Sequence, residues 1–161
     1  MLYQEEEKLK LLVSHYKQKV FGLVLYLIGG DRDKAYEVAA FSFAEAINRS
    51  SSLEKEDVLF NAVVSIAIEN SRSIKSIPTL EQIDVMDLSA EEKKSLGIIQ
   101  TALQTLSFEA KALLLLRDQL HLPCKDISAI MSISENYARV QIEQARSNLR
   151  KKIEEILNRE G

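Results

Sequence analysis

The chain has 161 residues, a net charge of −3 and 46% hydrophobic residues, so it has enough apolar content for a packed core and wholesale disorder is excluded. Five glycines and two prolines are too few for a β-rich fold with many turns. A single cysteine, Cys124, excludes an internal disulfide framework and a metal site built from several cysteines. It also indicates a reduced intracellular compartment.

The N-terminal sequence MLYQEEEKLK is acidic and polar and lacks the architecture of a signal peptide. The longest apolar run, around residues 20–28, is too short to span a bilayer. We therefore expect a cytoplasmic protein that does not bind a membrane.

Apolar residues at helical spacing predict the first two helices. The first covers residues 2–28 and ends at Gly29-Gly30, because glycine readily adopts the left-handed backbone of a helix C-terminus. Asp31 or Asp33 caps the second helix.

A third helix follows a capping box at residues 51–54 and runs to about Lys75. Residues 77–88 are acidic, contain a proline and show no convincing period, which indicates an interdomain linker. The predicted organisation is a helical domain of residues 1–76, this linker, and a second helical domain of residues 89–161.

The second domain is predicted to contain four helices. A capping box at residues 89–92 opens the first of them, and Ser107 caps the next, whose leucine run at 113–116 should be core. Pro123 then interrupts the pattern. The predicted fold class is all-α: three helices, an acidic linker and four helices.

Residues 122–150 predict a short helix, a tight turn and a longer helix, with Ser134 placed to cap the longer one. This arrangement describes a helix-turn-helix, whose second helix enters the major groove in DNA-binding proteins. Two helices of an ordinary bundle are the alternative. The inward stripe of the longer helix is Ala138, Ile142, Ala145 and Leu149.

The face opposite that stripe carries hydrogen-bonding side chains, and arginines line one flank. Amide side chains suit base edges and arginines suit phosphates, whereas Glu143 does not suit phosphate, although a carboxylate can accept from cytosine N4. Residues 124–152 contain six basic and three acidic residues, a modest excess, so unaided DNA binding should be weak and salt-sensitive. The predicted DNA-binding residues are Asn136, Tyr137, Arg139, Val140, Gln141, Gln144, Arg146, Ser147 and Arg150.

Catalytic chemistry has little support in the sequence. His15 and His121 are far apart, and no phosphate-binding glycine loop is present. Cys124 lies near a helix start, where a thiol pKa can fall, but a small half-buried side chain is the simpler interpretation. We expect no enzyme activity, no catalytic residue, no metal, no cofactor and no small-molecule substrate.

Residues 103–153 carry a set of landmarks: Leu106, Arg117, Asp126-Ile127, Ile133-Ser134, Ala145-Arg146 and Leu149-Arg150. With these landmarks the segment resembles region four of the extracytoplasmic-function (ECF) group of bacterial sigma factors, in the sigma-70 family. By this resemblance the second helix would meet a promoter −35 element while the protein is bound to core RNA polymerase. The resemblance also leaves open an anti-sigma protein as a partner.

The N-terminal half is more loosely similar to sigma region two. The resemblance implies a polymerase-binding surface at Glu37, Ala40 and Phe41, although the family usually has glutamine where Ala40 stands. The family's third helix normally offers a tryptophan or similar aromatic and several arginines, but this chain has no tryptophan. Strand melting needs aromatic stacking and cations, so region two is expected to be degenerate.

Three functions remain open. The first is a sigma factor that directs RNA polymerase to promoters and initiates transcription. The second is a degenerate sigma-like protein that serves as a protein-interaction module or accessory transcription regulator without promoter melting. A stand-alone dimeric repressor is a weaker third, because no exposed heptad seam is evident.

Overall fold

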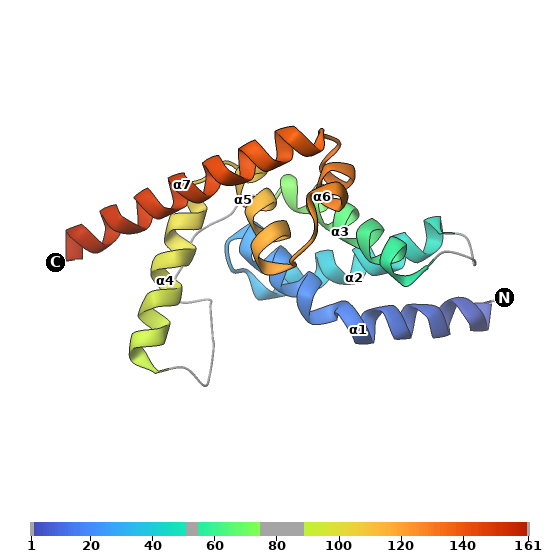
Figure 1. Cartoon of the computed structure of the whole chain (residues 1–161). Coiled ribbons are helices and arrows are strands. Elements are labelled where there is room, and N and C mark those ends of the chain that lie inside the picture. Colours follow the sequence, from blue (N-terminus) through green and yellow to red (C-terminus); the bar gives the residue numbers. More distant parts are fainter. Residues whose placement is uncertain (1, 51–54, 75–88, 161) are drawn as a thin grey trace.

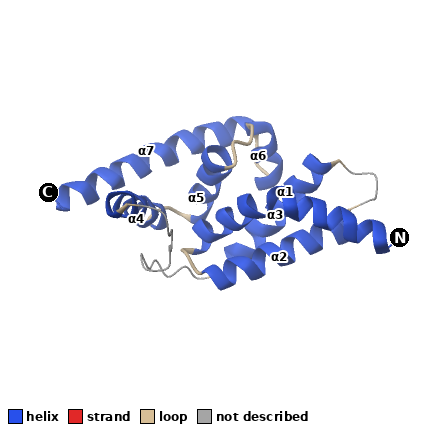
Figure 2. Cartoon of the chain, turned by 90° about the horizontal axis from the view of Figure 1, so that it is seen from below, coloured by secondary structure: helices blue, strands red, loops and turns tan. Residues whose placement is uncertain are grey.

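The computed structural model describes residues 2–50, 55–74 and 89–160. These ranges contain helices and connecting turns and no β-strand, so the all-α prediction is confirmed (Figure 2). The predicted capping box at residues 51–54 and the predicted linker at 77–88 lie outside the described residues. The division into two domains therefore stays a prediction.

The N-terminal half is a bundle of α1 (Leu2–Ile28), α2 (Arg32–Arg49) and α3 (Glu56–Arg72). Gly29 and Gly30 end α1 with φ angles of 89° and 102°, a conformation that glycine adopts without steric cost. Asp31 is the cap of α2, since its Oδ1 accepts a hydrogen bond from the Lys34 amide at 3.1 Å. The predicted end of α1 and the predicted cap of α2 are thus confirmed.

Helix α3 ends earlier than the sequence pattern predicts. Its last residue is Arg72 and Ser73 is the C-cap, whereas the apolar pattern extends the helix to about Lys75. The Arg72 side chain extends to helix α5 (Phe108–Leu114), where it pairs with Glu109 and lies 5.0 Å from the ring centroid of Phe108. These contacts fix the end of α3 against the C-terminal half.

The C-terminal half contains α4 (Ala90–Gln104), α5 (Phe108–Leu114), the π-helical turn η2 (Leu115–Gln119), α6 (Cys124–Met131) and α7 (Glu135–Glu160). Ser89 and Ser107 cap α4 and α5 through their hydroxyl oxygens, as their positions predict. The leucine run at 113–116 is buried, which confirms it as core.

The π-helical turn was not predicted, because its sequence continues an ordinary helical pattern. In η2 the backbone widens so that the Leu120 amide donates to the Leu115 carbonyl at 3.0 Å. Leu115, Leu116 and Leu120 are all buried as a result. Burial of three leucines outweighs the poorer hydrogen-bond geometry of a π turn.

The two halves share one hydrophobic core. Residues of α1, α2 and α3 belong to the same buried cluster as residues of α5, η2, α6 and α7. Figure 1 shows α7 along one edge of the molecule and α1 and α2 along the opposite edge, with α5 and α6 between them. No helix in the described part of the chain is long and apolar enough to cross a membrane.

A buried lysine joins the halves. The Lys111 ammonium donates to the Leu27 carbonyl at the end of α1 (2.8 Å) and to the side-chain oxygen of Gln104 (2.9 Å). Gln104 in turn donates to the Tyr26 carbonyl at 3.1 Å. Burial lowers the pKa of Lys111 to about 8. This network satisfies carbonyls at the C-terminal end of α1 with groups from α4 and α5.

Candidate nucleic-acid interface

The turn between α6 and α7 has the geometry of a helix-turn-helix. Ser132 adopts a left-handed conformation, with φ 57° and ψ 46°, and ends α6. The amides of Ser132 and Ile133 both donate to the Ser128 carbonyl. Ser134 then caps α7, since its hydroxyl oxygen accepts from the Tyr137 amide at 3.1 Å, as predicted.

The inner faces of both helices are fixed by burial. Ile127 of α6 is fully buried in the shared core, and Ala138, Ile142 and Ala145 of α7 are buried as the apolar stripe predicts. Leu149 is partly buried beside a smaller cluster of α4, α5 and α7 residues. Both helices of the helix-turn-helix therefore pack against the rest of the molecule.

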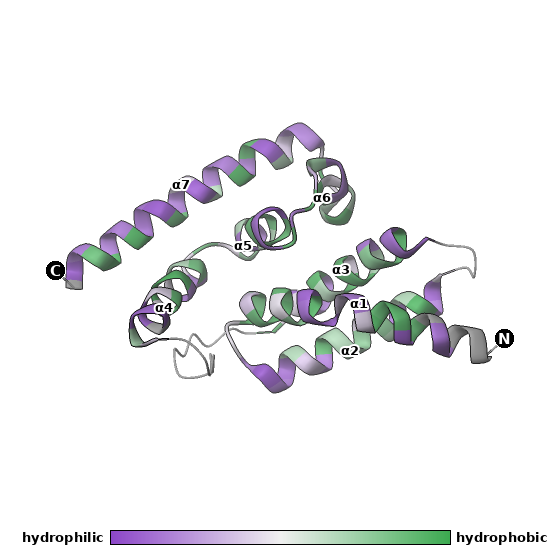
Figure 3. Cartoon of the chain, turned by 60° about the horizontal axis from the view of Figure 1, so that its bottom comes forward, coloured by the Kyte–Doolittle hydropathy of each residue, from purple (hydrophilic) through white to green (hydrophobic). Residues whose placement is uncertain are grey.

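The opposite face of α7 is exposed and largely polar. Figure 3 shows hydrophilic residues along the outer side of this helix. Tyr137 and Val140 are each 54% exposed although both are largely apolar. Of the remaining uncharged residues predicted to bind DNA, Gln141 is half-buried and the exposed ones are Asn136, Gln144 and Ser147.

The arginine flank divides into two kinds of residue. Arg139 and Arg150 are exposed, and each is available to a phosphate at this edge of the helix. Arg146 is half-buried and ion-paired: its Nε lies 3.1 Å from Oδ2 of Asp118, and a second nitrogen bonds the other Asp118 oxygen. A third nitrogen lies 2.9 Å from a Glu143 oxygen.

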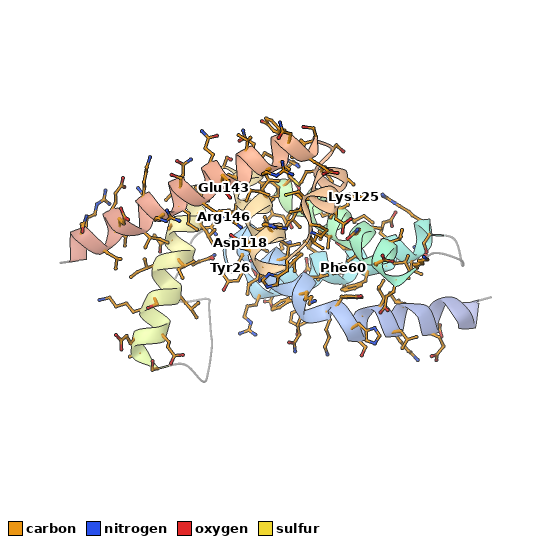
Figure 4. All side chains as sticks on the ribbon, in the orientation of Figure 1. Tyr26, Phe60, Asp118, Lys125, Glu143 and Arg146 are labelled. Carbon is orange, nitrogen blue, oxygen red and sulfur yellow. The ribbon has the colours of Figure 1, made fainter. Side chains whose placement is uncertain are left out.

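These two carboxylates hold the Arg146 guanidinium between α7 and η2, as the labelled side chains in Figure 4 show. The hydrogen bond to Asp118 is the main cause of a raised Arg146 pKa. The predicted role of Arg146 as a phosphate contact stays a prediction, and phosphate would have to compete with Asp118. Sequence reasoning missed Asp118, because it lies 28 residues before Arg146 and no local spacing connects the two.

The predicted polymerase-binding residues lie together on an exposed face of α2. Glu37, Ala40 and Phe41 are all exposed, and Phe41 is 52% exposed. Tyr36 extends this surface: it is 65% exposed and its ring lies 4.6 Å from that of Phe21 on α1. Sequence reasoning did not single out Tyr36, although its spacing from Ala40 on the helix could have indicated it.

The residues considered for catalysis lie apart from one another. His15 is exposed and pairs with Glu56, and His121 is exposed at the end of η2 with a φ of 56°. Cys124 is half-buried at the start of α6, in line with the simpler interpretation of a small packing residue. Across the described ranges, histidine, cysteine and acidic side chains do not gather in threes where they could hold a metal ion.

The fold and this interface define a helix-turn-helix domain. Residues 96–149, which make up less than half of the chain, match the family model of sigma-70, region 4. A search of curated proteins finds no match. The resemblance of residues 103–153 to region four is thus confirmed, and the domain has a sigma-factor-like, DNA-binding role in transcription. The family match does not include the N-terminal bundle, so its likeness to region two stays a prediction.

Proposed function

We propose that this protein is an ECF-type sigma factor that directs RNA polymerase to promoters in the cytoplasm. The observation that carries the proposal is the region 4 match over residues 96–149, together with a helix-turn-helix whose outer face on α7 is open to a partner. Phosphate would meet the arginine flank, and base edges would meet the polar outer residues.

The α2 surface supports a polymerase partner. Exposed aromatic side chains are enriched in protein interfaces, and Tyr36 and Phe41 stand on one helix with exposed Glu37 beside them. Binding to polymerase would also raise the effective DNA concentration around α7. This would compensate for the low DNA affinity that follows from the small number of unpaired cations on this helix. The proposal therefore needs both surfaces, one on each half of the chain.

A second function is favoured by helix α3. Phe60 is its aromatic side chain, and it is buried and stacked on Tyr16 with ring centroids 4.3 Å apart. Asn70 donates to the Ile66 carbonyl at 2.9 Å instead of facing outward freely. Within the described residues of α3 there is thus no exposed aromatic platform for a melted strand. This favours an accessory regulator that binds protein partners and does not melt promoters.

Co-elution with bacterial core RNA polymerase on gel filtration tests the proposal. We expect the wild-type chain to co-elute, Phe41→Glu to abolish co-elution, and Val58→Glu to preserve it, because Val58 is similarly exposed on α3. Circular dichroism of each variant confirms that it is folded. A folded wild-type chain that elutes separately from the polymerase would favour the accessory regulator.

A further inference from the structure

We propose that the helix-turn-helix selects A·T-rich major-groove sequence, with Tyr137 and Val140 contacting thymine methyl groups. The inference rests on the DNA-binding part of the proposed function and is independent of polymerase binding. It concerns which bases this chain prefers, and it follows from the chemistry of the outer face of α7.

The apolar side chains at the start of α7 are the first observation. Tyr137 and Val140 lie one turn apart and are each 54% exposed, so neither is explained by packing within the chain. The third exposed large apolar residue of α7, Leu157, lies 17 positions after Val140, about 25 Å further along the axis. The N-terminal part of a recognition helix is the part that contacts base edges.

Thymine is the base that offers an apolar group there. Its C5-methyl projects into the major groove and is contacted by apolar side chains. Val140 has no hydrogen-bonding group, so a methyl is the natural partner for it. Tyr137, one turn before Val140, is equally exposed and offers a second apolar surface.

The amide side chains beside Tyr137 and Val140 also favour an A·T base pair. Asn136 and Gln144 are exposed on either side of Val140, at helical spacings of four residues. Asparagine and glutamine form paired hydrogen bonds with N6 and N7 of adenine. Neighbouring side chains on one strip of the helix can thus contact both adenine and thymine.

The outer face of α7 lacks the groups that usually recognise guanine. Its recognition normally uses a free arginine or lysine that bonds O6 and N7 together. Arg146 is held by Asp118 and Glu143, while Arg139 and Arg150 lie on the flank where the phosphates would pass. The centre of the outer face therefore lacks an unpaired cation.

The experiment begins with selection of duplexes from a randomised library by the full chain at low ionic strength, where phosphate contacts are strongest. In the best duplex, each thymine is then replaced by uracil, which removes only the C5-methyl. We expect enrichment of A·T pairs, and one or two uracil positions that weaken binding about fourfold, the effect of one buried methyl.

Single substitutions on α7 identify the side chain that contacts a thymine methyl group. We expect Val140→Ala to fold normally, since Val140 is exposed, and to become insensitive to uracil at one position. Leu157→Ala is the matched control and should keep the wild-type sensitivity. Selection of G·C-rich duplexes, or no effect of uracil at any position, overturns this inference and leaves DNA binding intact. A folded chain that enriches no duplex overturns both the inference and the DNA-binding function.

Discussion

Ser132 sets the angle between the two helices of the helix-turn-helix, and it does so in a conformation that L-residues disfavour. Its φ of 57° is left-handed, a conformation that costs about 1–2 kcal/mol for a residue with a Cβ. We expect Ser132→Gly to raise the free energy of unfolding by about 1 kcal/mol, because glycine adopts this conformation freely. Denaturant unfolding measures this difference.

Ser132→Val is the opposite control, since a β-branched residue is more strongly disfavoured there. It should lower the free energy of unfolding. Equal stability of the Gly and Val variants would contradict the account of this turn.

Lys111 is an ionisable group that the fold removes from water. Its pKa of about 8, against an ordinary 10.5, means that the folded state releases a proton between these values while the unfolded state still holds it. Stability must therefore rise with pH in this window, because the unfolded state binds more protons. We expect the free energy of unfolding of the wild type to increase relative to that of Lys111→Met as the pH rises from about 8 to 10.5.

Lys10→Met, which removes an exposed lysine of α1, is the matched control variant. A constant difference between wild type and Lys111→Met across the window would show that burial does not lower this pKa.

At the scale of the element, one ion pair joins η2 to α7. Asp118 and Arg146 are both partly exposed, so their pair is expected to contribute at most about 1 kcal/mol to stability. Asp118→Asn should therefore destabilise the fold slightly. It should also strengthen DNA binding, because Arg146 would then pair with Glu143 alone and a negative charge beside α7 is removed.

Titrations of one duplex with wild type and Asp118→Asn measure this effect. Glu109→Gln, on α5, is the matched loss of a carboxylate, because Glu109 pairs with Arg72 of α3 instead of with a residue of α7. Weaker binding by Asp118→Asn than by Glu109→Gln would mean that the pair positions the recognition helix and that Arg146 contacts no phosphate.

The elements that the sequence predicts well are those set by local chemistry. The bounds of α1, the caps Asp31, Ser107 and Ser134, and the buried stripe of α7 follow from residue spacing and hydrogen-bonding side chains. The π-helical turn η2 and the engagement of Arg146 could not be predicted. Both depend on partners distant in sequence, which periodicity does not encode.

For the whole molecule, Gly22 lies where the two halves of the chain meet. A Cβ at Gly22 of α1 would lie 3.0 Å from the side-chain nitrogen of Gln119 in η2, closer than most Cβ contacts. Gly22→Leu should therefore push η2 away from α1 and separate the halves. We expect a larger radius of gyration by small-angle X-ray scattering, with helix content unchanged by circular dichroism.

Gly22→Ala is the control, since the flexible end of Gln119 can move by a few tenths of an ångström to accommodate one methyl. Its radius of gyration should equal that of the wild type. A wild-type radius of gyration for Gly22→Leu would show that the shared core accommodates the leucine side chain. Gly22 would then not control how the two halves meet.

The central claim is that the outer face of α7 contacts DNA, and the salt dependence of binding tests it most directly. Arg139 is exposed on the flank of α7 and Arg159 lies 20 residues further along, about 30 Å away on the same helix. On one selected duplex, Arg139→Ala should weaken binding and reduce the slope of log affinity against log salt by about one, while Arg159→Ala should leave both unchanged. Identical affinities and slopes for wild type, Arg139→Ala and Arg159→Ala would contradict the claim.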